Sequence, residues 1–208
     1  MIIGLVGFIS AGKGIAGHAL KDLGFVEDSF AAPLKDALSA IFGWERHLLE
    51  GDTTESREFR EQIDPWWAKK LNIQNFSPRK AMQNISTDVF RKYFNDDLWM
   101  LSLERRFLNK NSNKVITDVR FRNELKLIKN LGGKIIRIKK GPEPEWYETA
   151  LENNTTKSGI MEIKYPNIHI SEWDWIGSPD IDLVIENDGT IEDLNIKIKN
   201  QINQWMEL

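Results

Sequence analysis

Hydrophobic residues along the chain gather in four short, continuous runs that are rich in β-branched side chains. The runs are "IIGLV" (2–6), "KVIT" (114–117), "KIIRI" (134–138) and "DLVIE" (182–186). Continuous apolar runs of this length are typical of strands that are covered on both faces. The pattern therefore predicts four strands of a mostly parallel sheet.

Apolar residues between these runs recur at helical spacing instead. "KGIAGHALKDLG" and "PLKDALSAIFG" each close on a glycine, Gly24 and Gly43, which is the residue that most often ends a helix. A third helical segment, "RNELKLIKNLGG", leads into the run at 134–138. Strands that alternate with helices predict an α/β fold in three layers, with a mostly parallel sheet and helices on both faces.

Two long segments follow neither period. Residues 44–75 are charged and carry tryptophans, and residues 140–180 are rich in proline. Compact domains rarely keep irregular segments of this length unless they serve as lids or binding loops. We therefore expect one domain over 1–208, with a substrate-binding insertion at 44–108 and a lid-like irregular segment at 140–180.

Composition narrows the class of protein by exclusion. With 208 residues, 41% of them apolar, the chain can form a folded domain of ordinary size. A formal charge of −3 argues against a general nucleic-acid binder, and the lack of cysteine excludes disulfides and thiolate metal sites. No apolar run approaches the roughly 20 residues that span a bilayer, so we expect a cytoplasmic protein.

The stretch "GFISAGKG" (7–14) follows the first predicted strand and opens the first predicted helix. Its G-x-x-x-x-G-K spacing is typical of phosphate-binding loops, in which glycines turn backbone N–H groups toward an anion and the lysine, here Lys13, reaches the outer phosphates. A purely structural glycine turn is the alternative. Such loops usually carry a hydroxyl residue for the metal ion after the lysine, but this chain has Gly14 and Ile15 there.

A second candidate for chemistry lies at the end of the second predicted strand, in "VITDVR". Ligands of open α/β sheets bind beyond the carboxyl ends of the strands, where Asp118 and Arg120 are expected. The carboxylate can hold or orient Mg²⁺ and its waters, and the guanidinium can clamp a phosphate. The alternative is that Asp118 only caps the next helix and Arg120 lies in solvent.

A third feature is the helix predicted to start at Ser77 and Pro78, in "SPRKAMQNISTDVFRKYF". At 100° per residue its apolar residues share one face, and the opposite face gathers arginine, amide and hydroxyl groups. Such a polar face can bind a monophosphate and a base edge, although an ordinary solvated face is the alternative. The apolar face consists of Met82, Ile85, Val89 and Tyr93, and the polar face of Arg79, Gln83, Ser86, Thr87 and Arg91.

Weaker signals come from the C-terminal motif and from one tryptophan. In "ENDGTIEDL", Asn187 follows the last strand in a turn, and Thr190 with Asp193 forms a capping pair for the last helix. The same loop can hold an adenine ring. Tryptophans usually lie in the core, but Trp99 in "NDDLWM" is a candidate for lining a base pocket.

Seven motifs, taken in order, resemble the deoxynucleoside monophosphate kinases of tailed bacteriophages, which have the P-loop nucleoside monophosphate kinase fold. The motifs are "GFISAGKG", "FAAPLKDALSAIFG", "RKAMQNISTDVF", "DLW", "VITDVRFRNE", "HISE" and "ENDGTIEDL". The resemblance runs nearly end to end and thins in residues 44–75 and 140–168. It implies a small monophosphate-binding helical region and a lid beside the sheet.

The resemblance also implies an activity, namely transfer of the γ-phosphoryl group of ATP to a deoxynucleoside monophosphate with Mg²⁺ as cofactor. It implies action in the host cytoplasm if the chain is phage-encoded, and association into a homodimer. Lys13, Asp118 and Arg120 would be catalytic, Asp118 would hold the metal, and His169 and Glu172 would belong to the lid. The expected ATP-binding residues are Phe8, Ile9, Ser10, Ala11, Gly12, Lys13, Gly14 and Asn187. With the polar helix face included, the expected dNMP-binding residues are Lys35, Arg79, Gln83, Ser86, Thr87, Arg91, Trp99, Asp118, Arg120 and Glu124.

Other functions stay open at this stage. One is a P-loop kinase for another small acceptor, such as dephospho-coenzyme A or a sugar acid. Another is a nucleotide-binding module without catalysis, which Gly14 favours because the loop then lacks its metal-binding hydroxyl. Nucleic-acid binding has the least support, since the net charge is negative and the chain has no long basic run.

Overall fold

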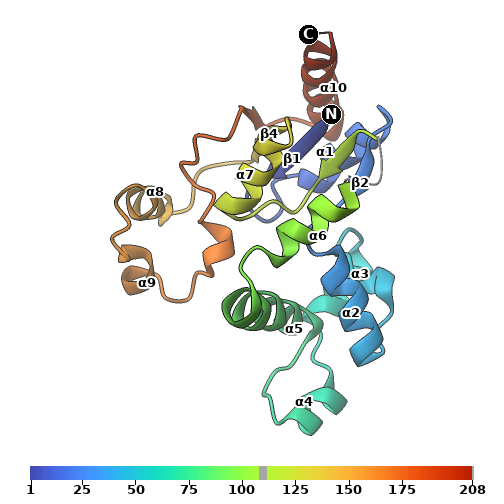
Figure 1. Ribbon diagram of the computed structural model, residues 1–208, viewed down its shortest axis with the longest axis vertical. Coiled ribbons are helices and arrows are strands. Elements are labelled where there is room, and N and C mark those ends of the chain that lie inside the picture. The colour runs from blue at the N-terminus through green and yellow to red at the C-terminus, as the bar shows by residue number, and fades with distance from the viewer. Residues whose placement is uncertain (108–111, 208) are drawn as a thin grey trace. The chain divides into compact units, whose positions relative to one another are not determined.

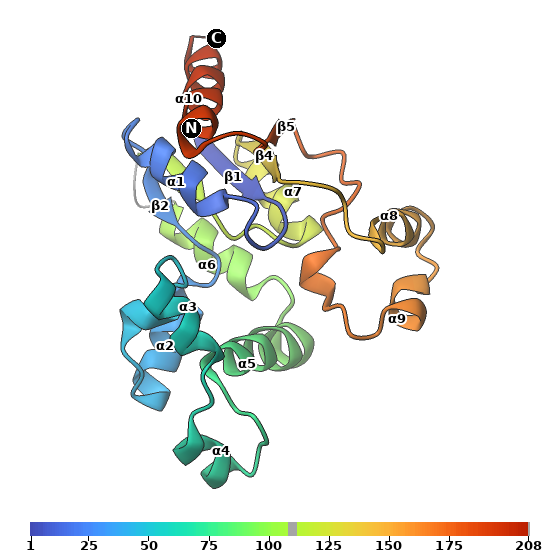
Figure 2. The same cartoon turned by 180° about the vertical axis from the view of Figure 1, so that it is seen from behind.

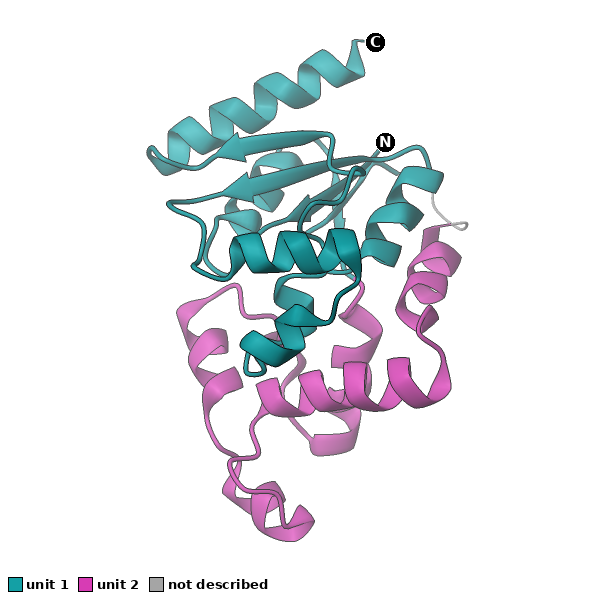
Figure 3. Ribbon diagram, turned by 90° about the vertical axis from the view of Figure 1, so that its left-hand side faces the viewer, with its two compact units in different colours: residues 1–29, 110–208 teal, residues 30–109 magenta. Residues whose placement is uncertain are grey.

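The computed structural model describes residues 1–107 and 112–207, and the chain divides into two compact units (Figure 3). Unit 1 comprises residues 1–29 and 110–208, and unit 2 comprises residues 30–109. Unit 2 thus begins upstream of residue 44, where the sequence predicts the insertion to start. The predicted end of the insertion, residue 108, lies outside the described residues.

Unit 1 is built on a parallel sheet with the strand order β2-β3-β1-β4-β5. The predicted α/β class and all four predicted strands are confirmed. The strands are β1 (Ile2–Val6), β2 (Val26–Asp28), β3 (Lys114–Ile116), β4 (Lys134–Lys139) and β5 (Leu183–Glu186).

The edge strand β2 is the one that the hydrophobic pattern did not predict. It has three residues, and its single apolar side chain, Val26, is half exposed, so it forms no apolar run. An ion pair of 2.7 Å between Lys114 of β3 and Asp28 of β2 helps to fasten this strand, and both side chains are largely buried. Polar pairing of this kind leaves little hydrophobic signal in the sequence.

Helices cover both faces of the sheet, as predicted (Figures 1 and 2). Helices α1 and α10 pack against each other and share one core with Ile3 and Leu5 of β1. Gly4, between those residues, faces the other side of the sheet, where a Cβ atom would lie 2.7 Å from the side chain of Ile128 of α7. The helices of unit 1 are α1 (Lys13–Lys21), α7 (Arg122–Asn130), α8 (Tyr147–Thr156), α9 (Ile160–Lys164), η3 (Ile170–Glu172) and α10 (Ile191–Met206).

The predicted helix ends are partly confirmed. Helix α2 ends at Gly43, which adopts the left-handed conformation that favours glycine there. Helix α1 ends at Lys21 with Asp22 as its C-cap, so Gly24 lies in the turn beyond it rather than at the cap. The predicted capping pair of α10 is confirmed, because Thr190 N–H donates to Asp193 Oδ2 over 2.8 Å.

The prediction that residues 140–180 are irregular is wrong, because this segment contains α8, α9 and η3. The reason lies in the buried side of α8, which consists of Ala150, Asn153 and Asn154. A helix that turns asparagines inward shows no apolar period, so hydrophobic patterning cannot detect it.

Every regular element that the described residues of unit 2 form is a helix. Residues 44–75, also expected to be irregular, contain η1, α3 and α4. Helix α3 is strongly polar and is opened by a capping box of Thr53 and Ser56, so it too lacks an apolar period. The elements are α2 (Ala32–Phe42), η1 (Arg46–Leu49), α3 (Thr54–Glu61), α4 (Pro65–Leu71), α5 (Pro78–Gln83), η2 (Asn84–Phe94) and α6 (Leu98–Phe107).

The predicted helix at Ser77 begins where expected, since the Ser77 side chain accepts a hydrogen bond from the N–H of Lys80. After Gln83, however, it continues as the π-helix η2, whose i→i+5 bonds give more residues per turn than an α-helix has. The faces expected at 100° per residue therefore do not hold beyond α5. Val89 and Tyr93, expected on the apolar face, are 49% and 76% exposed.

None of the helices in residues 1–107 and 112–207 is long and apolar enough to cross a membrane.

Candidate active site

The loop between β1 and α1 has a backbone that only glycine can adopt at two positions. A Cβ atom at Gly7 would lie 2.3 Å from the carbonyl oxygen of Ile138, and one at Gly12 would lie 2.6 Å from Asn187 Nδ2. Both glycines also have positive φ, as does Ser10 between them. The motif glycines are thus required by the shape of the loop, which suits a loop that turns backbone N–H groups toward an anion.

Lys13, the last residue of that motif pattern, is folded back onto its own loop. Its Nζ donates to the carbonyl oxygens of Gly7 over 2.7 Å and Phe8 over 2.8 Å. Burial and, to a smaller extent, the charge of Arg120 lower the pKa of Lys13 to about 8, although the charges of Glu172 and Asp118 act in the opposite direction. The structure therefore brings these three predicted residues within electrostatic range of the lysine.

Sheet topology explains why these residues meet. Strand β1 lies between β3 and β4, and the carboxyl ends of parallel strands share one edge. The loop with Lys13 leaves β1 at that edge, and Asp118 and Arg120 follow β3 at the same edge. Asp118 is not the N-cap of α7, because that position belongs to Phe121, so the capping alternative for Asp118 is wrong.

Glu124 holds the backbone next to Arg120. Its carboxylate accepts hydrogen bonds from the N–H of Arg120 over 2.7 Å and from that of Phe121 over 3.0 Å. The side chain is buried, with 3% of its surface exposed. In unit 1, then, Glu124 positions Arg120; a direct contact of Glu124 with a monophosphate stays a prediction.

The segment that carries the predicted lid residues His169 and Glu172 contacts Arg120, which follows β3. Arg120 Nη1 donates to Glu172 Oε1 over 3.0 Å and to Ser171 Oγ over 3.4 Å. His169 is the N-cap of η3, because its Nδ1 accepts from the N–H of Ser171. Glu172 therefore orients Arg120, and His169 shapes the turn that carries Glu172.

Hydrogen bonds from Arg122 and Asn154 hold the residues just after Glu172 in place. Arg122 donates to the carbonyl oxygens of Asp174 and Ile176, both over 2.8 Å. From α8, Asn154 Nδ2 donates to the carbonyl oxygens of Trp173 over 2.8 Å and Ile176 over 3.0 Å. The turn that carries Glu172 to Arg120 is thus held in place by hydrogen bonds within unit 1.

Asn187 supports the phosphate loop through hydrogen bonds. Its Nδ2 donates to the carbonyl oxygen of Ala11 over 2.8 Å, and its backbone N–H donates to that of Lys139 over 2.7 Å. The side chain is 8% exposed. Its contact with adenine stays a prediction, whereas its support of the loop is a feature of the structure.

A metal ion would find few protein ligands at this edge of the sheet. Among the residues that the structure describes, no three His, Asp or Glu side chains form a group that can hold one. A Cβ atom at Gly14 would meet nothing within 4 Å, so packing does not forbid a hydroxyl there. Asp118 as a single carboxylate fits a Mg²⁺ ion that keeps mostly phosphate and water ligands.

Unit 2 carries the other predicted dNMP-binding residues on four helices. Within this unit, α2 contacts α5, and α6 contacts η2. Each of the three predicted cations already has a carboxylate partner, at 2.5 to 2.7 Å: Lys35 with Glu50, Arg79 with Glu61, and Arg91 with Asp96. The residues lie on α2 (Lys35), α5 (Arg79 and Gln83), η2 (Ser86, Thr87 and Arg91) and α6 (Trp99).

Glu50 is a residue that the sequence analysis missed. It pairs with the largely buried Lys35 and also with Arg46. Burial acts to raise the pKa of Glu50, but the hydrogen bonds and charges of Lys35 and Arg46 outweigh it and hold that pKa below its usual value. The available signal was the i,i+4 spacing of Arg46 and Glu50, which alone suggests only a surface pair.

Trp99 is buried, with 7% of its surface exposed, and packs edge-on against Phe90 with ring centroids 5.5 Å apart. Its indole N–H has no hydrogen-bond partner among the described residues. A role in a base pocket stays a prediction.

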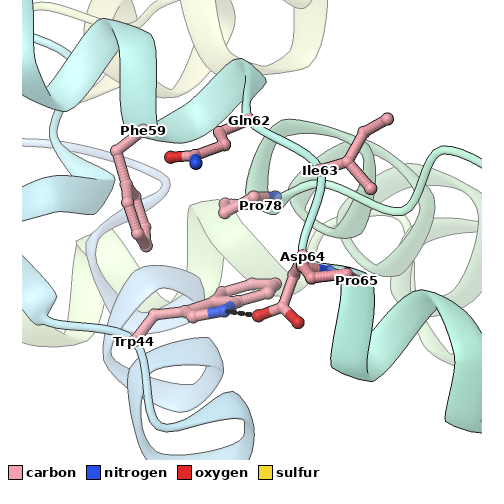
Figure 4. A pocket seen from close by; sticks show the side chains of 7 residues that line it. All are labelled: Trp44, Phe59, Gln62, Ile63, Asp64, Pro65 and Pro78. Atoms are coloured by element: carbon pink, nitrogen blue, oxygen red, sulfur yellow. Dashed lines mark hydrogen bonds between the residues drawn. The ribbon is translucent and has the colours of Figure 1, made fainter.

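Unit 2 also has a cavity of about 200 Å³, which none of the predicted site residues lines (Figure 4). Trp44 Nε1 donates to Asp64 Oδ2 over 2.9 Å, and the other carboxylate oxygen of Asp64 accepts from the N–H of Trp67. Since both oxygens of Asp64 are engaged in holding the start of α4, we assign them a structural role. The lining residues are Trp44, Phe59, Gln62, Ile63, Asp64, Pro65 and Pro78.

Comparisons with known proteins place the chain in a family by its sequence. Residues 45–198 match the family described as deoxynucleotide monophosphate kinase. A protein of Acanthamoeba polyphaga mimivirus named "Putative deoxynucleotide monophosphate kinase" is 31% identical over 213 residues, which cover 95% of this chain and 94% of the viral protein.

Solved structures give weaker likenesses. Dephospho-CoA kinase from Campylobacter jejuni is 16% identical, with a TM-score of 0.49 and coverage of 98% of this chain and 96% of that one. Shikimate kinase from Aquifex aeolicus is 14% identical, with a TM-score of 0.44 and coverage of 98% and 97%. The assignment to a family therefore rests on the sequence comparisons.

Proposed function

Because the chain belongs to the deoxynucleotide monophosphate kinase family, we propose that it transfers the γ-phosphoryl group of ATP to a deoxynucleoside 5′-monophosphate. The products are ADP and the deoxynucleoside diphosphate. Phosphoryl transfer asks little covalent chemistry of a protein; it needs two anions in line, their charge neutralised and water kept out. The observation that carries the proposal is the convergence of Lys13, Asp118 and Arg120 at one edge of the sheet.

Residues 8–14 bind the ATP phosphates in this proposal. Lys13 leaves the carbonyl oxygens of Gly7 and Phe8 and moves its ammonium group to the β- and γ-phosphates. Asn187 keeps the loop in place through Ala11 and lies near the adenine. The polyanion offsets the burial of Lys13, so the lysine is fully protonated once ATP is bound.

Arg120 exchanges one partner for another as the reaction proceeds. Its Nη1 donates to Glu172 before substrate binds, and a phosphoryl group can replace that carboxylate because arginine binds carboxylate and phosphate oxygens through the same N–H donors. Glu172 and His169 belong to the segment that we propose to shield the reaction from water.

Arg79, Arg91 and Lys35 bind the monophosphate of the acceptor. Each is paired with a carboxylate in the absence of substrate, so the dianionic phosphate takes over a cation that is already oriented. The amide and hydroxyl groups bind sugar and base, with Trp99 beside the base. These residues are Gln83, Ser86 and Thr87.

Asp118 holds the metal ion, directly or through water. When bound, Mg²⁺ neutralises charge on the ATP phosphates. Glu172 accepts a hydrogen bond from Arg120 and Glu124 accepts from the backbone at the start of α7, so we assign the metal to Asp118, the acid that follows β3. We also propose that two copies of the chain associate into a homodimer.

A coupled assay of ADP formation across deoxy- and ribonucleoside monophosphates tests this function. We expect ATP-dependent turnover with at least one dNMP, and we expect Lys13→Ala to reduce it by at least about 100-fold. ATP binding without turnover on any acceptor would instead support a nucleotide-binding module. Turnover confined to dephospho-coenzyme A or a sugar acid would support the other kinase classes.

A further inference from the structure

Phe8, the second residue of the phosphate loop motif, directs its side chain into an aromatic cluster of unit 1. Its ring centroid lies 5.4 Å from that of Trp146, 6.3 Å from that of Tyr147 and 5.1 Å from that of Trp175. The first two contacts are edge-on, which is a favourable arrangement of aromatic rings. Three tryptophan and tyrosine rings thus surround one residue of the loop.

Arg137, in the centre of β4, places a positive charge against three rings of this cluster. Its guanidinium carbon lies 5.8 Å from the ring centroid of Phe8, 5.2 Å from that of Tyr147 and 5.0 Å from that of Trp175. Its Nη2 donates to both oxygens of Glu143, and its Nη1 donates to the hydroxyl of Tyr147 over 3.0 Å. Arg137 is 7% exposed, and its Nε has no partner among the described residues.

Stability alone does not explain a buried arginine in an apolar strand. A buried ion pair gains little because desolvation opposes the attraction, and an apolar replacement is often neutral or stabilising. The cation does attract the faces of the rings that lie within about 6 Å of it, including the ring of Phe8, and this attraction favours one orientation of those rings.

The backbone of Phe8 is where the fixed ring affects the site. Its carbonyl oxygen accepts from Lys13 Nζ over 2.8 Å and from the N–H of Ala11 over 3.2 Å. The preceding residue, Gly7, packs so closely on β4 that a Cβ atom would clash with Ile138. Gly7 is therefore held by its packing on β4, and Phe8 by Arg137 of β4 and the aromatic rings around it. These two residues form the start of the phosphate loop.

We propose that Phe8 is a positioning residue whose ring, held by Arg137 and the three aromatic neighbours, keeps the phosphate loop in its nucleotide-accepting shape. The inference rests on the proposed function, because it assumes that the loop binds the phosphates of ATP. It predicts a selective loss of nucleotide affinity when the ring is removed. We expect chemistry and acceptor binding to be affected far less, because the ring packs among Trp146, Tyr147 and Trp175.

Phe8→Leu tests this, because it removes the ring and keeps an apolar side chain. We expect the Kd of ADP, measured by titration calorimetry, and the KM of ATP to rise about tenfold, with kcat and the KM of the dNMP changed less than about twofold. Phe8→Tyr keeps the ring and should restore both values. Phe25→Leu makes the same change at a buried core position; it should lower the melting temperature without changing the Kd of ADP.

A second variant keeps the proposal testable if Phe8→Leu does not fold. Arg137→Met combined with Glu143→Gln removes the cation without leaving an unpaired carboxylate, and it should raise the Kd of ADP in the same direction. An unchanged Kd in both variants, or equal losses in kcat and in both KM values, would overturn the inference while the kinase function stands. Weaker ADP binding in the variants of a protein that phosphorylates no dNMP would leave the inference standing and overturn the function.

Discussion

At the scale of single residues, Gly14 raises the sharpest question, because it occupies the position where phosphate loops usually carry a hydroxyl for the metal. A Cβ atom there would meet nothing within 4 Å, so a serine fits. In the proposed function, metal positioning then depends on Asp118. Substitutions at Asp118 and at Gly14 can therefore be compared to find which position matters for the metal.

We predict that Asp118→Asn lowers kcat/KM on the order of 100-fold, or about 2.7 kcal/mol of transition-state stabilisation, because the amide keeps the shape and loses the charge. Gly14→Ser should change kcat/KM by no more than about threefold. Steady-state assays over a range of Mg²⁺ concentrations measure both. Equal losses, or a larger loss for Gly14→Ser, would show that the metal has been assigned to the wrong residue.

Lys13 gives a prediction about protons. Burial holds its pKa at about 8, below the usual 10.5, so near pH 8 about half of the free protein carries a neutral lysine. A bound polyanion raises this pKa again, so nucleotide binding takes up a proton, increasingly so as the pH rises from 7 toward 8.5.

Calorimetric titration of ADP in buffers of different ionisation enthalpy measures that uptake. Lys13→Met, which keeps the length of the side chain and cannot titrate, should remove the pH-dependent part. Proton uptake that is the same in both proteins would mean that another group titrates.

Local motifs made part of the site predictable, and distant contacts did not. The loop could be identified because its glycines and Lys13 lie within eight residues of each other. The pairing of Arg120 with Glu172 joins residues 52 apart, and nothing in either motif indicates it. Arg137 did leave a signal, a charge inside the apolar run "KIIRI", but that signal does not reveal the aromatic rings around it.

At the scale of elements, hydrophobic patterning found the strands because both faces of each central strand are covered. It missed β2, whose pairing relies on Lys114 and Asp28, and α8, whose buried side carries Asn153 and Asn154. The change from α5 to the π-helix η2 has no sequence signal that we can identify. A π-helix of 11 residues is rare, because π-helices mostly occur as single turns inside α-helices.

Asn154 of α8 allows a test of how the lid-like segment is held. Its amide donates to the carbonyl oxygens of Trp173 and Ile176, and an aspartate of the same shape has no such donors. Asn154→Asp should lower the free energy of unfolding by about 1–3 kcal/mol and the melting temperature by roughly 3–10 °C.

Thermal unfolding of this variant beside Asn167→Asp, the same change at an exposed site, measures the effect. Because the turn after Glu172 also orients Arg120, kcat/KM should fall in Asn154→Asp at a temperature where the variant is fully folded. Unfolding curves that match those of Asn167→Asp would contradict the structural role of the buried amide.

At the scale of the whole molecule, this acidic chain pairs with carboxylates the cations that we propose to bind phosphate. They are Lys35, Arg79, Arg91 and Arg120, so a net charge of −3 is compatible with local sites for a phosphate. Composition could exclude classes of function, but only the motifs and the contacts around them could indicate phosphoryl transfer. The homodimer remains a proposal, and sedimentation at micromolar concentration would measure its mass against the 24.1 kDa of one chain.

The proposed phosphoryl transfer can be observed by following the γ-phosphoryl group itself. ATP labelled at its γ-phosphate is incubated with the protein, Mg²⁺ and each dNMP, and the products are separated. We predict that the label appears in the β-phosphate of a dNDP and that Lys13→Ala abolishes this transfer. Label that stays in ATP, or passes only to inorganic phosphate, with every dNMP would show that the protein is not a deoxynucleoside monophosphate kinase.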